Sequence, residues 1–196
     1  MKKTVNKKGI KEWALAHAKG PFSTFWLALF SFAESSFFPI PPDAIMIAIL
    51  LLKQQAKWIY YATITTVFSV AGGLFGYLIG FLFFEAVGGS IVSFYNLESH
   101  LATVASFFSN NAFFTIFLAA FTPIPYKVFT ISAGLFKIDI FIFIIASILG
   151  RAIRFFAIAY FVKLYGKRIA SVLYKYFNVV SIAVVIIIGV IIYLLV

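Results

Sequence analysis

The chain has 196 residues, 63% of them hydrophobic and only 11% charged. Because a water-soluble domain usually carries about a quarter charged residues, this composition excludes a soluble globule and makes the bilayer the solvent for most of the chain. The net charge of +10 is typical of a cytoplasmic membrane surface rather than of nucleic-acid binding, since most basic residues lie outside the apolar segments.

The N-terminal segment, residues 1–20, predicts an amphipathic helix that lies in the membrane interface. Within 6–20 the lysines mostly lie away from one apolar helical face, which is formed by Ile10, Trp13, Ala14, His17 and Ala18. Trp13 is expected at the depth of the lipid headgroups.

The apolar segment 22–52 is interrupted by a proline-rich turn that ends in an acid: Pro39, Pro41, Pro42 and Asp43. A full span needs about 20 residues, so the segment is too long for one span and too short for two. The arm after the prolines, 44–52, rises only about 14 Å as a helix, roughly half of the hydrocarbon thickness. The pattern therefore predicts a re-entrant hairpin that enters and leaves on the same side of the membrane.

Segment 58–84 is long enough to cross the bilayer and contains three glycines at helical spacing: Gly72, Gly76 and Gly80. Such G-x-x-x-G spacing lets another helix approach closely, so we expect these glycines to be packing residues rather than ligand contacts. The next segment, 85–108, contains a second amphipathic pattern over 94–108, which predicts another interfacial helix.

The second half of the chain repeats the broken pattern. Residues 110–136 are interrupted by Pro123 and Pro125, and each arm is too short to cross the bilayer. Residues 138–162 are long enough to cross and carry Arg151 and Arg154. The last segment, 166–196, consists of a basic linker followed by an apolar run over 177–196, which predicts a C-terminal transmembrane helix.

The two halves align as an internal duplication. Residues 37–43 align with 121–127, 69–73 with 147–151, and 76–77 with 154–155. Because a hairpin returns to its own side and a crossing helix changes sides, the second unit must be inverted relative to the first. We therefore predict an all-α integral membrane protein with two inverted repeats, 21–84 and 109–165, in a membrane domain of 21–165.

The distribution of basic residues predicts the orientation. Lysines before the first hairpin, Lys53 and Lys57 after it, and the basic residues from Lys163 onward all fall on one side in this topology. The segment 85–111 has no Lys or Arg. The positive-inside rule then places the N-terminus in the cytoplasm, as expected for the plasma (inner) membrane of a prokaryote.

Five ionisable residues lie within the apolar segments: Glu34, Asp43, Lys127, Arg151 and Arg154. At membrane depth an unpaired Asp, Lys or Arg costs roughly 2.5–3.5 kcal/mol on insertion scales, so these residues are candidate functional residues. Arg151 and Arg154 share one helical face. Three cations against two acids leave a surplus positive charge, which favours binding of an anionic group such as phosphate.

A purely structural interpretation stays open. A pair of Asp43 with Arg154, or of Glu34 with Arg151, would fix the packing of the hairpins against the helices without any ligand. Turn formation by the prolines explains the helix breaks but not why both P-I-P turns end in a charge. Broken backbone at membrane depth persists only inside protein or facing water, so both turns are expected to line a shared interior.

These residues resemble the DedA superfamily, also called the SNARE-associated or VTT-domain family, and its YqaA-like branch in particular. The matching motifs span about residues 25–165: E-S-S-x-x-P-x-P-P-D from Glu34, G-x-x-x-G-Y from Gly72, F-T-P-I-P-Y-K from Phe121 and G-R-x-x-R-F from Gly150. The resemblance implies that the acids Glu34 and Asp43 act in transport and proton coupling. It also implies transport of undecaprenyl phosphate or phospholipids, with Arg151, Arg154 and Lys127 in the role of the family's membrane arginines.

Our first functional hypothesis is a lipid flippase or scramblase whose partners are anionic membrane lipids and protons. A proton-coupled transporter of a small soluble solute is the second. An intramembrane lipid-modifying enzyme is disfavoured, because the chain has no cysteine and its two histidines, His17 and His100, lie far from the arginines. The same residues disfavour a metal site, so no cofactor and no enzymatic activity are expected. The sequence leaves the oligomeric state open, a homo-oligomer included.

Overall fold

The computed structural model describes residues 22–37, 41–52, 55–88, 106, 108, 110–122 and 124–166, and every regular element within these ranges is helical. The predicted helices at 6–20 and 177–196, nearly all of the one at 94–108, and the turn residues Pro39 and Pro123 lie outside the described residues. The described residues thus belong to the two predicted repeats.

Four short helices form the broken segments: α2 (Ser23–Ser36), α3 (Pro42–Leu52), α7 (Ala112–Phe121) and α8 (Tyr126–Leu135). The longest has 14 residues and is about 21 Å long, so none of them can cross a bilayer. The breaks lie at the predicted positions. Pro42 is the first residue of α3 and Pro125 immediately precedes α8, positions at which proline's missing N–H costs little.

Two long helices form the centre of the fold: α4 (Trp58–Phe83) and α9 (Ile140–Tyr165), each with 26 residues. Each is about 39 Å long and exceeds the hydrocarbon thickness of about 30 Å. In the described part of the chain, two helical runs are long and apolar enough to cross a membrane, Gln55–Ala86 and Ile140–Tyr165. The first comprises α4 with a 3-10 turn before it (Gln55–Lys57) and part of a π-helical turn after it (Phe84–Gly88).

Helix α9 begins and ends later than the predicted 138–162. The Ile138 N–H donates to the Ala133 carbonyl oxygen at 2.9 Å, so Ile138 belongs to the turn that ends α8. Asp139 then caps α9, because its carboxylate accepts hydrogen bonds from the N–H groups of Phe141 and Ile142, both at 2.9 Å. The apolar character of Ile138 made it resemble the first residue of the crossing helix.

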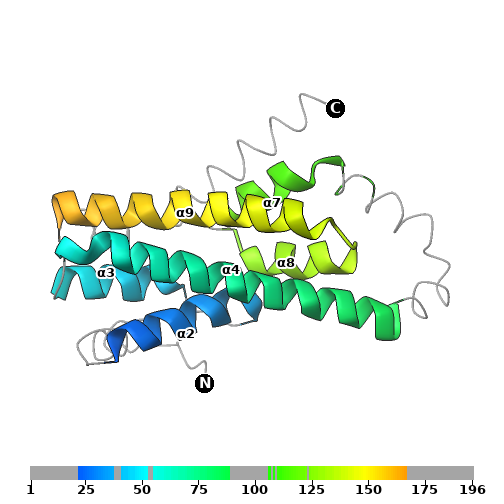
Figure 1. The fold of residues 1–196 in the computed structure, drawn as a ribbon, viewed down its shortest axis with the longest axis horizontal. Coiled ribbons are helices and arrows are strands. Elements are labelled where there is room, and N and C mark those ends of the chain that lie inside the picture. Colours follow the sequence, from blue (N-terminus) through cyan, green and yellow to red (C-terminus); the bar gives the residue numbers. More distant parts are fainter. Residues whose placement is uncertain are drawn as a thin grey trace, which may run out of the picture.

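The two hairpins approach the long helices from opposite ends (Figure 1). Helices α4 and α9 run antiparallel, α2 and α3 lie along one end of this pair, and α7 and α8 lie along the other. Helices α2 and α7 end, and α3 and α8 begin, near the middle of the long helices, so the two helix breaks lie in the same central region.

The arms of each hairpin contact the long helices of both predicted repeats. The first arm of each hairpin packs on the long helix of its own repeat, α2 on α4 and α7 on α9. The second arms pack mainly on the long helix of the other repeat, α8 on α4 and α3 on α9. Neither repeat can therefore bury its own surface alone, and the six helices form one packed unit.

Glycines bring the backbones of α4 and α8 into direct contact. A Cβ added at Gly80 would overlap the carbonyl oxygen of Ile131, and one added at Gly134 would overlap the carbonyl oxygen of Tyr77. Gly76 faces the same helix. Such close approach is what small residues permit in membrane helix packing, where van der Waals contact is the main attraction.

Gly72 and Gly150, which the predicted duplication aligns, have similar packing contacts. A Cβ at Gly72 would overlap the carbonyl oxygen of Phe32 in α2, and a Cβ at Gly150 would lie 2.7 Å from the carbonyl oxygen of Phe117 in α7. Each of these glycines therefore admits the first arm of its own hairpin, at corresponding positions of the duplication.

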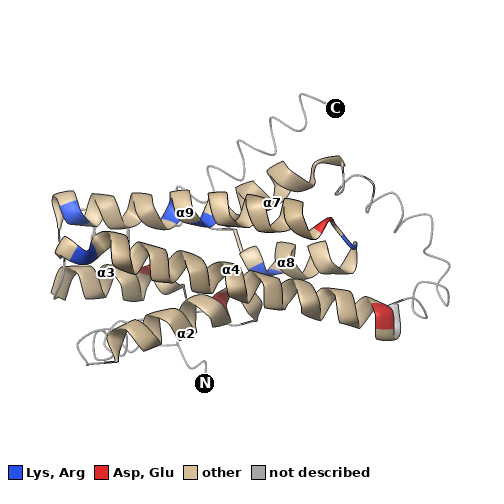
Figure 2. Ribbon diagram, in the orientation of Figure 1, with Lys and Arg blue, Asp and Glu red and all other residues tan. Residues whose placement is uncertain are grey.

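A buried polar layer separates two apolar cores. One core joins α2 and α3 to the first half of α4 and the last part of α9, and the other joins α7 and α8 to the opposite ends of the long helices. The buried polar residues between them include Ser35, Asp43, Ser69, Thr122, Thr130, Ser147, Arg151 and Arg154. Figure 2 shows charged segments in the middle of the otherwise uncharged bundle, as well as at its ends.

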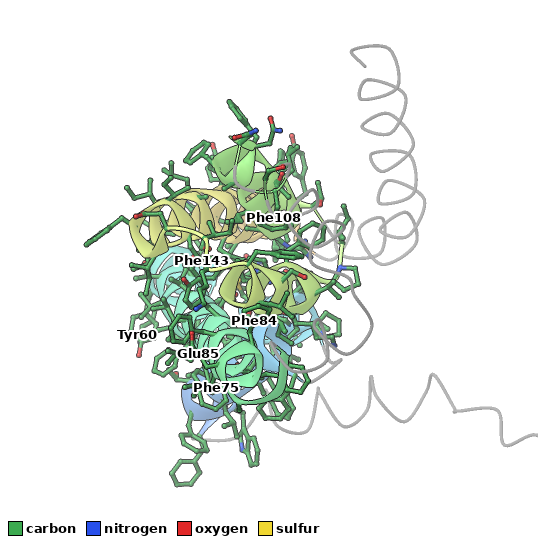
Figure 3. All side chains as sticks on the ribbon, turned by 90° about the vertical axis from the view of Figure 1, so that its right-hand side faces the viewer. Tyr60, Phe75, Phe84, Glu85, Phe108 and Phe143 are labelled. Carbon is green, nitrogen blue, oxygen red and sulfur yellow. The ribbon has the colours of Figure 1, made fainter. Side chains whose placement is uncertain are left out.

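The outer surface of the bundle is apolar. Viewed along the long axis, Phe143 lies inside the bundle, whereas Tyr60 and Phe75 point outward (Figure 3). Large apolar side chains are exposed along the outer faces of both long helices, among them Val67, Leu78, Ile145 and Ile153. Such a surface requires an apolar solvent, in agreement with a bilayer around these helices.

Candidate functional site

Arg154 of α9 joins the two helix breaks. One terminal nitrogen donates to the Asp43 carboxylate at 2.5 Å, and the other donates to the Thr122 carbonyl oxygen at 2.6 Å. Asp43 lies in the first turn after the first break, and Thr122 is the residue at which the second hairpin breaks. The Thr122 carbonyl has lost its helical partner because α7 ends there, which leaves it available to the guanidinium.

Asp43 is held where an acid is favoured. It stands in the first turn of α3, near backbone N–H groups without helical partners and at the positive end of the helix dipole. Its side chain and that of Arg154 are each 9% exposed, so the pair is buried. The second carboxylate oxygen, Oδ1, has no hydrogen-bond partner among the described residues.

Arg151, one turn earlier on α9, is held differently. It donates to the Glu34 carboxylate of α2 at 3.3 Å, and its guanidinium lies over the Tyr126 ring of α8, 4.0 Å from the centroid. The Phe155 ring lies further away, at 5.6 Å. Arg151 therefore links α2 to α8, just as Arg154 links the break of the first hairpin to that of the second.

Serine and tyrosine hydroxyls extend these contacts. Ser35 donates to Glu34 at 3.2 Å and shares a hydrogen bond of 2.7 Å with Ser69 of α4. The Tyr126 hydroxyl donates to Ser147 of α9 at 2.5 Å. Sequence reasoning did not assign these four residues to the site. The predicted duplication aligns Ser69 with Ser147, and this alignment is the sequence signal that could have identified both.

The remaining site residues are less closely grouped. Lys127 lies in the first turn of α8, is half-buried, and forms no ion pair with any residue in the described ranges. Pro41 and Pro125 are exposed at the breaks, and Pro42 is buried. The structure thus brings the two arginines and the two acids together in the pairs that the structural interpretation named, while Lys127 stays outside them.

A separate ion pair lies at one end of the long helices. Lys137, between α8 and α9, pairs with Glu85, which follows α4, and also lies over the rings of Phe81 and Phe84. Both charged side chains are about half exposed, so this pair contributes little to stability. At the other end, Lys163 lies over the Trp58 ring. Lys57 and Lys163 therefore share the end of the bundle that is predicted to face the cytoplasm.

Comparison with known proteins agrees with this class of membrane protein. The family model of the VTT domain matches residues 38–164. An uncharacterized protein of Haemophilus influenzae is 36% identical over 175 residues, which cover 89% of this chain and 88% of the relative. An uncharacterized protein of Histophilus somni is 33% identical over 175 residues, covering 88% of this chain and 89% of the relative. No solved structure matches the chain significantly.

The fold and the site define a helical membrane protein with charges buried between its helices. The chain belongs to the VTT-domain (DedA, SNARE-associated) family. The family is of a membrane-transporter type and is generally not enzymatic.

The two ion pairs should contribute differently to stability. Asp43→Asn leaves Arg154 buried without its counter-charge, and we expect it to lower the free energy of unfolding by about 3–5 kcal/mol. The double variant Asp43→Asn with Arg154→Gln should recover most of this loss, because both charges are removed. Glu34→Gln should cost only about 1–2 kcal/mol, since the 3.3 Å contact is long and the rings still hold Arg151.

Unfolding by SDS titration in mixed micelles measures these differences, with the exposed pair variant Glu85→Gln as the matched control. A double variant no more stable than Asp43→Asn alone would contradict the assignment of Arg154 as the partner of Asp43.

Proposed function

We propose that the protein moves an anionic lipid, a phospholipid or a polyprenyl phosphate, across the bilayer by admitting its headgroup to the buried charged layer. The observation that carries the proposal is the position of Arg151 and Arg154. Both guanidinium groups are buried at the level where two broken helices meet, and both are opposed by acids.

The chemistry of this layer suits a phosphate group. Charged residues within membrane segments are costly and are commonly found on substrate or proton pathways. The planar guanidinium matches phosphate through two parallel N–H donors, which a lysine ammonium cannot reproduce. With Lys127 included, the layer holds three cations and two acids, and a bound anion would balance the remaining charge.

The acids provide a means of coupling. Glu34 occupies the guanidinium of Arg151, which a phosphate would otherwise bind, and Asp43 holds the guanidinium of Arg154. Protonation removes the charge of a carboxylate and weakens its hold on the arginine. Proton binding at Glu34 would therefore free Arg151 for the substrate, proton binding at Asp43 would weaken the contact of Arg154 with the first hairpin, and both make transport dependent on protons.

The apolar outer surface supports a lipid as the substrate. The acyl chains of a lipid can stay in the bilayer against side chains such as Val67 and Ile153, so the protein has to shelter only the headgroup. The arrangement of the hairpins supports an inverted repeat, because they approach from opposite ends and meet near the middle of the long helices (Figure 1). Two re-entrant hairpins of this kind would open the polar layer to one side at a time.

The acids should be required for transport. We expect Glu34→Gln and Asp43→Asn to abolish movement of a fluorescent phosphatidylglycerol across reconstituted vesicles, because an amide keeps the shape of the side chain but cannot release a proton. Glu85→Gln, which alters the exposed pair at the end of the bundle, should transport as the unmodified protein does. Normal transport by both Glu34→Gln and Asp43→Asn at neutral and mildly acidic pH would rule out the coupling role.

The orientation is tested by accessibility. The chain has no cysteine, so single cysteines at Gln55 and Glu85, both exposed and at opposite ends of the run Gln55–Ala86, report on the two sides of the membrane. For a prokaryotic inner-membrane protein with a cytoplasmic N-terminus, an impermeant maleimide added to intact cells should label Glu85→Cys, and Gln55→Cys only after permeabilisation. External labelling of Gln55→Cys would show the reverse orientation.

A further inference from the structure

The two buried arginines differ in how they are held, and this difference divides their roles. Building on the proposed function, we infer that Arg151 is the arginine that binds the phosphate group of the substrate and that Tyr126 is the residue that positions it. Arg154 instead ties the two hairpins together and does not contact the headgroup.

Arg154 has its terminal nitrogens engaged by protein groups at short distances. The Asp43 carboxylate and the Thr122 carbonyl oxygen lie at 2.5 and 2.6 Å. These two acceptors belong to different hairpins, so a ligand that displaced either one would separate the breaks. A guanidinium that is bonded to both hairpins holds the two helix breaks together, and it is released only when the hairpins move apart.

Arg151 has donor capacity to spare. A guanidinium carries five N–H donors, and among the described residues Arg151 uses one hydrogen bond, the 3.3 Å contact with Glu34. Its Nε is buried and has no partner in this part of the chain. The side chain is 3% exposed, so its remaining donors are withheld from bulk water. These are the properties of a cation that is prepared to accept an anion.

The Tyr126 ring fixes the plane of this guanidinium. The ring is 1% exposed and lies 4.0 Å from the Arg151 guanidinium, close enough for a cation–π contact. On α4, Gly73 leaves the space that the ring occupies, because a Cβ there would lie 2.8 Å from the tyrosine oxygen. The hydroxyl is held by Ser147. Tyr126 is therefore fixed in position, and it keeps the Arg151 guanidinium in place when the Glu34 carboxylate dissociates and a phosphate binds.

Glu34 gives access to this site. Its side chain is 18% exposed, against 9% for Asp43, so the Glu34–Arg151 pair is the more accessible of the two. A phosphate that approaches from this side replaces the Glu34 carboxylate on Arg151 without disturbing the Asp43–Arg154 tie. The substrate site is thus the space beside Arg151 that Glu34 occupies when no substrate is bound.

The test compares binding with stability in the purified full chain. The probe is a fluorescent phosphatidylglycerol in detergent micelles, with a fluorescent diacylglycerol, which lacks the phosphate group, as the lipid control. We expect Arg151→Lys to weaken phosphatidylglycerol binding about tenfold or more while its midpoint of thermal unfolding stays close to that of the unmodified protein. Arg154→Lys should instead keep the affinity and unfold about 5–10 °C lower, because lysine cannot reach both hairpins.

Tyr126 is tested by changing the ring while keeping its volume. Tyr126→Phe is the reference for this series, since the ring remains and only the hydroxyl is lost. Phenylalanines with increasing fluorination at this position keep the shape but weaken the negative ring face, and they should lower the affinity stepwise. A merely structural role would leave the affinity unchanged along this series, and that result would overturn the assignment of Tyr126.

Three results separate the possible failures. Equal loss of affinity in Arg151→Lys and Arg154→Lys would overturn the division of roles and leave the transport proposal intact. No preference of the unmodified protein for phosphatidylglycerol over the phosphate-free diacylglycerol would overturn the transport proposal itself. Displacement of the labelled lipid by inorganic phosphate at the same concentration as by unlabelled lipid would assign the site to a free anion and overturn its assignment to a headgroup.

Discussion

Burial of two guanidinium groups beside two broken helices is the constraint on which the rest of this structure depends. An arginine at membrane depth needs acceptors, and an uninterrupted helix offers none because its carbonyls are already bonded. The proline breaks supply them: α7 ends and frees the Thr122 carbonyl, and α3 begins with Asp43 in its first turn. The breaks in turn need a partner for their backbone, and Arg154 is that partner. Charges and helix breaks thus require each other, and neither would persist alone in a bilayer.

The predicted duplication relates positions of α4 to the charged positions of α9. Gly73 and Gly76 of α4 align with Arg151 and Arg154 of α9. On the α4 side these glycines admit α8 so closely that Tyr126 and Thr130 touch the helix. On the α9 side the corresponding positions carry long cationic side chains that reach across to Glu34 and Asp43. One half therefore provides close backbone packing and the other provides charge. The proposed ligand site lies between α9 and the first hairpin, with the Tyr126 ring on its far side.

Much of this arrangement follows from sequence. The prolines mark both helix breaks, the long apolar runs mark α4 and α9, and the cost of buried charge leads to the pairs Asp43–Arg154 and Glu34–Arg151. Tertiary packing decides the rest. Helices α3 and α8 pack on the long helix of the other half through contacts between residues far apart in sequence. The hydrophobic periodicity of a single segment does not predict such contacts. Tyr126 was part of a recognised motif, but its position under Arg151 requires the approach of α8 at Gly73. The distinction between the two arginines depends on hydrogen-bond distances. The sequence does not show these distances, because Arg151 and Arg154 share the same helical face and the same apolar context.

The central claim is that the buried charges serve transport and do more than hold the helices together. The double variant Glu34→Gln with Arg151→Gln removes one acid and its arginine without leaving an unpaired charge, so the fold should be kept. Its transport of fluorescent phosphatidylglycerol in reconstituted vesicles, measured beside its thermal stability, separates the two interpretations. We predict a stable protein that no longer moves the lipid, because the phosphate-binding guanidinium is gone. A stable double variant with full transport would contradict the claim and would leave the pair as a packing device.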